Sequence, residues 1–168
     1  MTLTTHAVVG AAAASFFPQS PALAFAAGFA SHFLIDALPH WDYELRSKKD
    51  KTLHGTLNDD MDVRSGAFLF DCMRVGGDAL FGTALSIFIF SFWLFNLPLW
   101  LVVLGAWAGI LPDPLQFLYY KTRLKLLEPL QRFHIWIQKG RSIYPPPLLG
   151  IFYQTLLAVL VLGAAVFL

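Results

Sequence analysis

The stretch Gly28-Phe-Ala-Ser-His32-Phe-Leu-Ile-Asp36-Ala-Leu-Pro-His40-Trp-Asp42-Tyr43 places two histidines and two aspartates at the end of an otherwise apolar helix. His32 and Asp36 are four residues apart and therefore share one helix face. The proline that follows is expected to end the helix and to place His40 and Asp42 at the boundary with water. Imidazole nitrogen and carboxylate oxygen form the ligand set of zinc and other transition-metal sites. Because ionisable groups are costly inside a bilayer and usually mark function there, the stretch predicts a membrane helix that ends in a polar site.

The composition is that of an integral membrane protein. Hydrophobic residues make up 57% of the 168 residues and charged residues only 14%, values outside the usual range of soluble domains. We therefore expect an all-α, polytopic protein that forms a single transmembrane domain over residues 1–168. The net charge of +1 and the lack of a basic stripe with interleaved aromatic residues argue against a nucleic-acid partner. Cys72 is the only cysteine, so no intrachain disulfide forms.

Apolar runs predict about five transmembrane helices, arranged as two hairpins and a C-terminal span. The third run is longer than a bilayer core of ~30 Å requires at ~1.5 Å per residue, so its first turns lie in the interface or the helix breaks at Gly76-Gly77. The short first run, which no basic residue precedes, is expected to stay in the mature protein rather than to be removed as a targeting segment. The expected spans are 6–17, 22–38, 66–97, 99–113 and 148–168.

The distribution of basic residues predicts the orientation. Every Lys and Arg lies between Arg46 and Arg141, in or beside the connections that follow the second and fourth spans. The positive-inside rule places these connections, including the polar loop 39–64, and the N-terminus on the cytoplasmic side of the cytoplasmic membrane. The segment 119–143 mixes basic with aromatic and leucine residues, a pattern typical of an amphipathic helix on the membrane surface.

This orientation brings further polar residues to the same leaflet. His6 opens the first span, Asp78 lies early in the third and Asp113 closes the fourth. Together with the four residues of the first stretch, these make seven candidate ligands, whereas a single zinc ion takes about four. Either some of the seven residues orient the ligands without binding metal themselves, or two divalent ions, zinc or manganese, share the site. We predict His6, His32, Asp36, His40 and Asp113 as metal ligands, and Asp42 and Asp78 as catalytic residues, Asp42 as a ligand or as a general base through water.

Each of these residues also has a purely structural interpretation, which the sequence leaves open. His32 and Asp36 could hold helices together by hydrogen bonds, at about 0.6 kcal/mol each. His134, in the basic amphipathic segment, is expected to be an interfacial side chain rather than a ligand. The remaining structural interpretations are an interfacial cap (His40, Asp42), an ion pair with Arg74 (Asp78), a helix-ending turn (Asp113) and a solvated loop (His54, Asp59, Asp60, Asp62).

Three short motifs resemble those of the YdjM-like membrane-bound metal-dependent hydrolases of bacteria: Thr5-His6, Ser31-His32-x-x-x-Asp36 and Gly109-Ile-Leu-Pro-Asp113. The resemblance implies a multi-span inner-membrane protein whose metal ligands include an early His, a Ser-His-x-x-x-Asp element and a Pro-Asp element. The resemblance is limited to these three short motifs. Asp113 is followed by Pro114 where the family has a second Asp nearby, the motif order differs, and the family's His-Arg-x-x-x-His-Ser element has at best a remnant in Arg132-Phe-His134.

A metal site at headgroup level predicts a class of reaction. Two ions ~3.5 to 4 Å apart clamp the attacking and leaving oxygens in phosphoester hydrolysis, and bound metal generates hydroxide without a Ser or Cys nucleophile. Phospholipids or polyprenyl phosphates are the expected substrates, attracted by Arg132, Lys139 or Arg141. The alternative is a non-catalytic subunit or scaffold that packs against partner membrane proteins or further copies of the chain. Transport is disfavoured because all charge lies at one leaflet.

Overall fold

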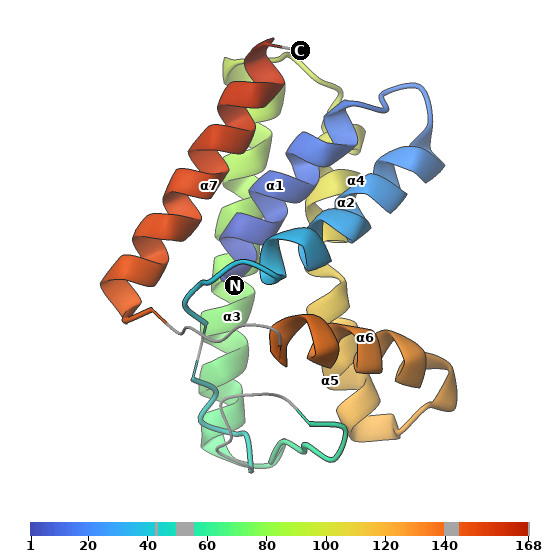
Figure 1. Cartoon of the computed structure of the whole chain (residues 1–168), viewed down its shortest axis with the longest axis vertical. Coiled ribbons are helices and arrows are strands. Elements are labelled where there is room, and N and C mark those ends of the chain that lie inside the picture. Colours follow the sequence, from blue (N-terminus) through green and yellow to red (C-terminus); the bar gives the residue numbers. More distant parts are fainter. Residues whose placement is uncertain (43, 50–55, 140–144, 168) are drawn as a thin grey trace.

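The computed structural model describes residues 1–42, 44–49, 56–139 and 145–167, and over these residues the chain is helical apart from loops and one isolated antiparallel bridge between Lys48 and Met61. The expectation of an all-α protein is confirmed. The helices are α1 (Leu3–Ser15), α2 (Pro21–Asp36), α3 (Gly66–Ile87) with the π-helical continuation η1 (Phe88–Trp93), α4 (Leu99–Ile110), α5 (Pro112–Thr122), the 3₁₀ turn η2 (Lys125–Leu127), α6 (Glu128–Lys139) and α7 (Pro147–Phe167) (Figure 1).

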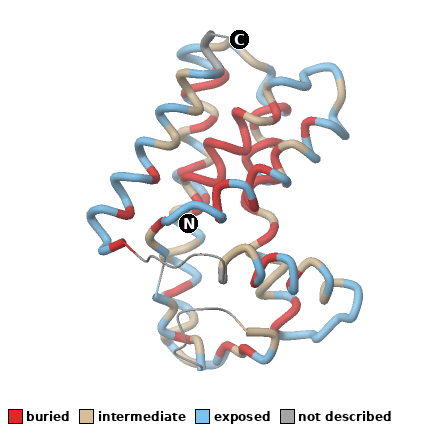
Figure 2. The backbone as a smooth tube through the Cα atoms, viewed as in Figure 1, coloured by how far each residue is buried: buried red, intermediate tan, exposed pale blue. Residues whose placement is uncertain are grey.

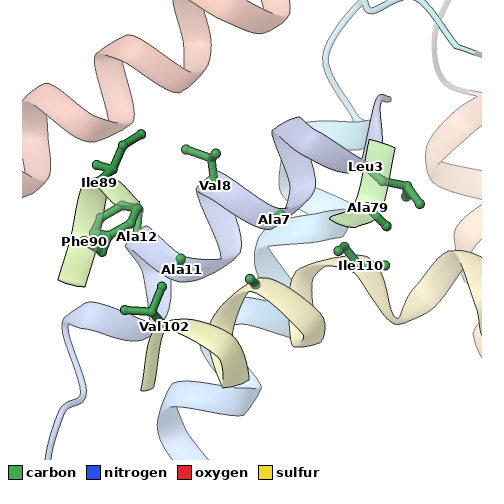
Figure 3. Packing of buried hydrophobic residues seen from close by; sticks show 11 residues of the cluster. Leu3, Ala7, Val8, Ala11, Ala12, Ala79, Ile89, Phe90, Val102 and Ile110 are labelled. Atoms are coloured by element: carbon green, nitrogen blue, oxygen red, sulfur yellow. The ribbon is translucent and has the colours of Figure 1, made fainter. Parts of the chain in front are cut away.

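Helix α1 lies at the centre of the molecule. It contacts α2, α3, α4 and α7, and most of its residues are buried (Figure 2). A helix that is apolar on all sides requires such surroundings. Its alanines and valines pack with apolar residues of α3, η1 and α4 in one continuous core, which Figure 3 shows from close by (Leu3, Ala7, Val8, Ala11, Ala12, Ala79, Ile89, Phe90, Val102, Ile110).

Glycines bring α1 and α4 into backbone contact. A Cβ atom on Gly105 would lie 2.5 Å from Ala14 Cβ, and one on Gly10 would overlap the carbonyl oxygen of Gly105. Gly109, four residues after Gly105, lies against the backbone of His6. Small residues at a spacing of four let helix backbones approach closely. The crossing therefore holds His6 beside the point where α4 ends.

Helix lengths support fewer membrane crossings than the apolar runs predict. Two helices are long and apolar enough to cross a bilayer, Gly66–Trp93 and Pro147–Ala164, and the bent pair α4 and α5 would be a third. Helices α1 and α2 have 13 and 16 residues, about 20 and 24 Å at 1.5 Å per residue, against a hydrocarbon core of ~30 Å. A break at Gly76-Gly77 does not occur, because α3 continues through both glycines.

Two predicted helices have different bounds in the structure. The predicted span 99–113 is interrupted: α4 ends at Ile110, and α5 begins at Pro112 with a bend of 45°. Pro112 and Pro114 lack the backbone N–H that would continue the α4 hydrogen bonds. The prediction of a single surface helix over 119–143 is wrong. Arg123 adopts a left-handed conformation (φ 53°) that ends α5, and α6 is a separate helix that begins at Glu128. Residues 140–143 lie outside the described residues.

Charge divides the molecule into two ends. Residues 1–35, 79–112 and 142–168 contain no Asp, Glu, Lys or Arg. These stretches supply α1, nearly all of α2, the second part of α3 with η1, α4 and α7, which gather in the upper part of Figure 1. The charged segments form the first part of α3, α5, α6 and the loops in the lower part. The C-terminus of α2 contacts α6 at the boundary between the two ends, and the N-terminus of α1 lies beside Asp36 at the end of α2.

A candidate metal centre at the boundary between the two ends

Asp36 is the centre of a buried cluster of imidazoles. It is the last residue of α2, and its side chain is 1% exposed. Its Oδ1 lies 3.3 Å from His6 Nε2 and 3.5 Å from His40 Nε2, while its Oδ2 lies 3.5 Å from His32 Nε2 and 3.2 Å from His134 Nε2. All four histidines are buried. One carboxylate therefore joins ring nitrogens from α1, α2, the loop after α2 and α6.

The Oδ2 side of Asp36 has the spacing of a metal ligand set. His32 Nε2 lies 3.2 Å from His134 Nε2 and 3.6 Å from Asp113 Oδ1, and the distance from His134 Nε2 to Asp113 Oδ1 is 3.9 Å. Ligands of a tetrahedral zinc ion with bonds of ~2.0 to 2.2 Å lie about 3.3 to 3.6 Å apart. Nitrogen and oxygen atoms of His32, Asp113 and His134 thus converge as they would around one ion.

The Oδ1 side of Asp36 forms a second set. His6 and His40 approach Oδ1, and the ammonium group of Met1 lies 3.2 Å from Oδ1 and 2.8 Å from His40 Nε2. Asp42 Oδ2 is 3.4 Å from the same ammonium. A positive charge is therefore accommodated among these nitrogen and oxygen atoms. His6, His32 and Asp36 also form a group with ligand spacing, so the two sets adjoin.

Backbone carbonyls fix the orientation of two imidazoles. His32 Nδ1 lies 2.8 Å from the carbonyl oxygen of Gly109, and His40 Nδ1 lies 2.8 Å from that of Leu38. A carbonyl accepts only, so each Nδ1 carries a proton, and a neutral ring in this orientation presents the lone pair of Nε2 to the cluster. This is how proteins orient metal-binding histidines. The His32 lone pair then faces carboxylate oxygens and His134 Nε2, an arrangement that a cation would stabilise.

His6 provides an independent indication of a missing partner. Its side chain is fully buried: Nε2 lies 3.3 Å from Asp36 Oδ1 but outside hydrogen-bonding geometry, and Nδ1 has no hydrogen-bond partner among the described residues. Its ring stacks on that of His32, with centroids 3.9 Å apart. Buried polar atoms are nearly always satisfied, and an unsatisfied one calls for an explanation such as an ion. The residues of this cluster therefore fit a divalent metal in donor chemistry, spacing and unmet polar atoms.

Helix α6 turns its polar face inward. Gln131, His134 and Ile135 are buried, while Phe133 and Trp136 point outward and are exposed. Gln138 donates to Asp36 Oδ2 at 3.2 Å and approaches His134 Nε2 at 3.0 Å. The expectation that His134 is an interfacial side chain is wrong, because the polar stripe of α6 covers the cluster. In the sequence this face is indicated by the spacing of Gln131, His134 and Gln138, which are three and four residues apart and therefore share one side of a helix.

Asp78 and Asp42, the residues predicted to be catalytic, contact the first residues of the chain, Thr4 and Met1 respectively. Asp78 in α3 accepts from the backbone N–H of Thr4 at 3.0 Å and from its hydroxyl at 2.6 Å. It thereby satisfies one of the free N–H groups at the start of α1, two residues before His6. Asp42 is 43% exposed and lies beside the Met1 ammonium. Arg74, the pair partner expected for Asp78, donates to the carbonyl of Glu44 at 3.2 Å.

Helix α7 is tied to the cluster by one polar side chain. Gln154 is buried and accepts from the backbone N–H of Thr2 at 3.2 Å and from its hydroxyl at 3.0 Å, and it donates to the carbonyl of Trp41 at 2.6 Å. Gly150, one turn earlier, lies so close to Trp41 that a Cβ atom would be 2.5 Å from its Cβ. Gln154 thus holds together the segments that carry His6 and His40.

The acidic loop is not simply solvated, as expected, but is bound to α5. Asp59 is buried and pairs with Lys48 at 2.8 Å, and Arg123 donates to its carbonyl oxygen at 2.6 Å. Asp60 accepts from Lys121 and Lys49, each at 2.6 Å. These two ammonium groups, Lys121 foremost, hold the pKa of Asp60 well below its usual range. His54 lies outside the described residues.

Comparison with protein-family models, with curated proteins and with solved structures finds no match for this chain.

Proposed function

We propose that the protein is a membrane-embedded hydrolase that binds divalent metal ions and acts on a phosphoester of lipid-like character. The observation that carries the proposal is the convergence on one buried carboxylate, Asp36, of four imidazoles from separate segments of the chain. Hydrogen-bonded helix packing requires only one or two such groups. A carboxylate surrounded by four imidazoles is costly to bury unless the cluster binds an ion.

The two oxygens of Asp36 divide the ligands into two sets. His32, His134 and Asp113 would hold one ion with Oδ2. His6 and His40 would hold a second with Oδ1, in the place that the Met1 ammonium takes in this structure. When bound, such ions lower the pKa of a coordinated water and stabilise the charge on phosphate oxygens. Zinc and manganese both suit a set of imidazoles and carboxylates.

The remaining polar residues orient the ligands and give access to water. Gly109 and Leu38 carbonyls keep His32 and His40 in the tautomer that can bind metal. Asp42, which is exposed, and Asp113, which is 30% exposed, connect the cluster with the surface. Asp42 would accept a proton from water during hydrolysis, the role of a general base.

The position of the cluster supports a lipid substrate. It lies where the charge-free helices meet the charged end of the molecule, the level at which lipid headgroups lie in a bilayer. The basic residues of the charged end favour the cytoplasmic leaflet by the positive-inside rule, and the membrane proposed is the inner membrane of a bacterium. Arg132 on α6 belongs to the basic group that would attract anionic headgroups, whereas Arg141 and the side chain of Lys139 lie outside the described part.

Metal analysis of the purified protein tests this function. Wild-type protein, purified without chelator and dialysed, is expected to hold stoichiometric zinc or manganese by elemental mass spectrometry. His32→Ala and Asp36→Asn should lose it, and Asp60→Asn, which alters an ion pair outside the cluster, should keep it. The wild type and Asp60→Asn should release phosphate or headgroup from phospholipids or polyprenyl phosphates in nanodiscs, and Asp36→Asn should not. If the folded wild type contained no metal, the cluster would serve only to pack helices, and the alternative of a non-catalytic scaffold would be favoured.

A further inference from the structure

An apolar groove runs between α2 and α6, directly beside the cluster. Its volume is about 820 Å³, and none of the described residues that line it is charged. One wall comes from α2 and the other from the outward face of α6 (Ala30, Phe33, Leu34, Ala37; Phe133, Trp136, Ile137). The alanines leave room between the larger side chains.

The groove is part of an exposed apolar surface. Leu34 is 72% exposed and Trp136 68%, whereas His134 and Gln131 on the opposite face of α6 are buried. A helix at a protein–water boundary normally has the reverse arrangement, with its apolar face inward. Side chains of this kind therefore meet an apolar partner outside the protein.

One aromatic ring separates the groove from the cluster. The Phe33 ring lies 5.2 Å from the His32 ring and 5.4 Å from the His134 ring, measured between centroids, and 5.1 Å from the Phe133 ring. Phe33 follows His32 in α2, and Ala37 follows Asp36. The groove consequently lies one aromatic ring away from His32 and His134.

We propose that the groove binds the hydrocarbon chain of the lipid whose phosphate group is hydrolysed at the cluster. This inference rests on the proposed function and names its substrate class. Such a lipid is complementary to the site at both ends, because its chain matches the uncharged lining and its phosphate matches a cationic metal centre. The groove also adjoins the charge-free end of the molecule, which places its opening next to the bilayer interior, the source of such chains.

Photolabelling tests where the chain binds. The probe is phosphatidylglycerol with a diazirine in its acyl chain, present at a few per cent in nanodiscs of unlabelled lipid with wild-type protein. The label is expected to be enriched on residues 30–37 and 133–137 relative to the exposed apolar residues of α3 and α7. Ala30→Trp and Ala37→Trp, which fill the groove, should lower this labelling by about tenfold, the loss expected when about two methylene groups leave an apolar contact. The control Leu160→Trp, on the exposed face of α7, should not.

Uniform labelling of all exposed apolar faces, or enrichment that Ala30→Trp does not reduce, would overturn the groove assignment. Protection of the groove from label by a second copy or another protein would overturn it too. Metal content and hydrolysis of a soluble short-chain phosphodiester, measured on the same samples, separate the two proposals. Groove labelling without metal or hydrolysis refutes only the function, and a metal-loaded, active protein without groove labelling refutes only the groove. If both hold, Ala30→Trp keeps metal and short-chain turnover but loses long-chain turnover.

Discussion

His134 Nε2 lies 3.2 Å from Asp36 Oδ2, although 98 residues separate the two in the chain. The contact joins α6 to the end of α2 inside a region from which water is largely excluded. Both side chains are 1% exposed. An imidazole and a carboxylate at this distance, with His32 Nε2 3.2 Å from the same imidazole, form part of a buried polar cluster that no single helix could provide.

Replacement of His134 should remove metal from the Oδ2 side of Asp36. His134→Ala deletes one of the four ligands predicted there, and we expect it to lower the metal content by at least one equivalent per chain while the helical circular dichroism is retained. Trp136→Phe, on the opposite face of α6, is the control and should keep full occupancy. Equal metal content in His134→Ala and wild type would show that His134 is not a ligand.

The α1–α4 contact should be essential for stability. Gly105→Val places two methyl groups against the Ala14 side chain and the Gly10 backbone, and overpacking of this kind costs about 1–3 kcal/mol. The cluster should lose metal as well, because His6 shifts with α1. Gly76→Ala on α3 also replaces a helical glycine, but its Cβ atom meets open space. Helix propensity therefore predicts a free energy of unfolding higher by about 0.5–1 kcal/mol. Thermal unfolding in detergent measures both; equal melting temperatures for the two variants would contradict the packing argument.

Gln154 should act on the Oδ1 side of Asp36 through the segments that it holds. Gln154→Leu leaves the backbone groups of Thr2 and Trp41 without this partner, at a cost of about 1–3 kcal/mol when such groups are buried. Metal titration with a chromophoric chelator should show weaker binding of the second ion and nearly unchanged binding of the first. Thr155→Val, which removes only a hydroxyl bonded within α7, is the matched control. Loss of both ions in equal measure would point to general destabilisation instead.

The loop contact at Asp60 should give a defined pH dependence. Lys121 and Lys49 lower the pKa of Asp60 in the folded protein, so folding favours its ionised form. The stabilisation is fully present above the unfolded pKa of ~4 and is lost as the pH falls through the lower folded value. The melting temperature of wild type should therefore exceed that of Asp60→Asn at neutral pH, and the difference should disappear in strong acid. A difference independent of pH would show that the charge has no role.

Part of this arrangement could be predicted from the sequence for clear physical reasons. The spacing of four residues places His32 and Asp36 on one face of any helix, and Pro39 and Pro112 end helices next to His40 and Asp113. The structure brings these residues together with His6. His134 was missed because periodicity shows that α6 has two faces but not which one faces the protein, and in a membrane the apolar face can be outside.

The number of spans could not be predicted from hydropathy, because burial in protein and burial in lipid select the same residues. Helix α1 is apolar because four helices surround it, not because it is long enough to cross a bilayer by itself. Asp78 shows a similar ambiguity. Its position near the start of the third apolar run was apparent in the sequence, but only the fold reveals its contact with Thr4 at the start of α1.

X-ray absorption at the metal edge of the purified, metal-saturated protein shows directly whether the cluster around Asp36 binds metal. We expect two zinc or manganese ions per chain, with imidazole nitrogen and carboxylate oxygen ligands, a metal–metal distance of ~3.5–4 Å, and loss of that distance in Asp36→Asn. A folded protein that binds no metal at saturation, or metal whose first neighbours include no imidazole, would contradict this expectation.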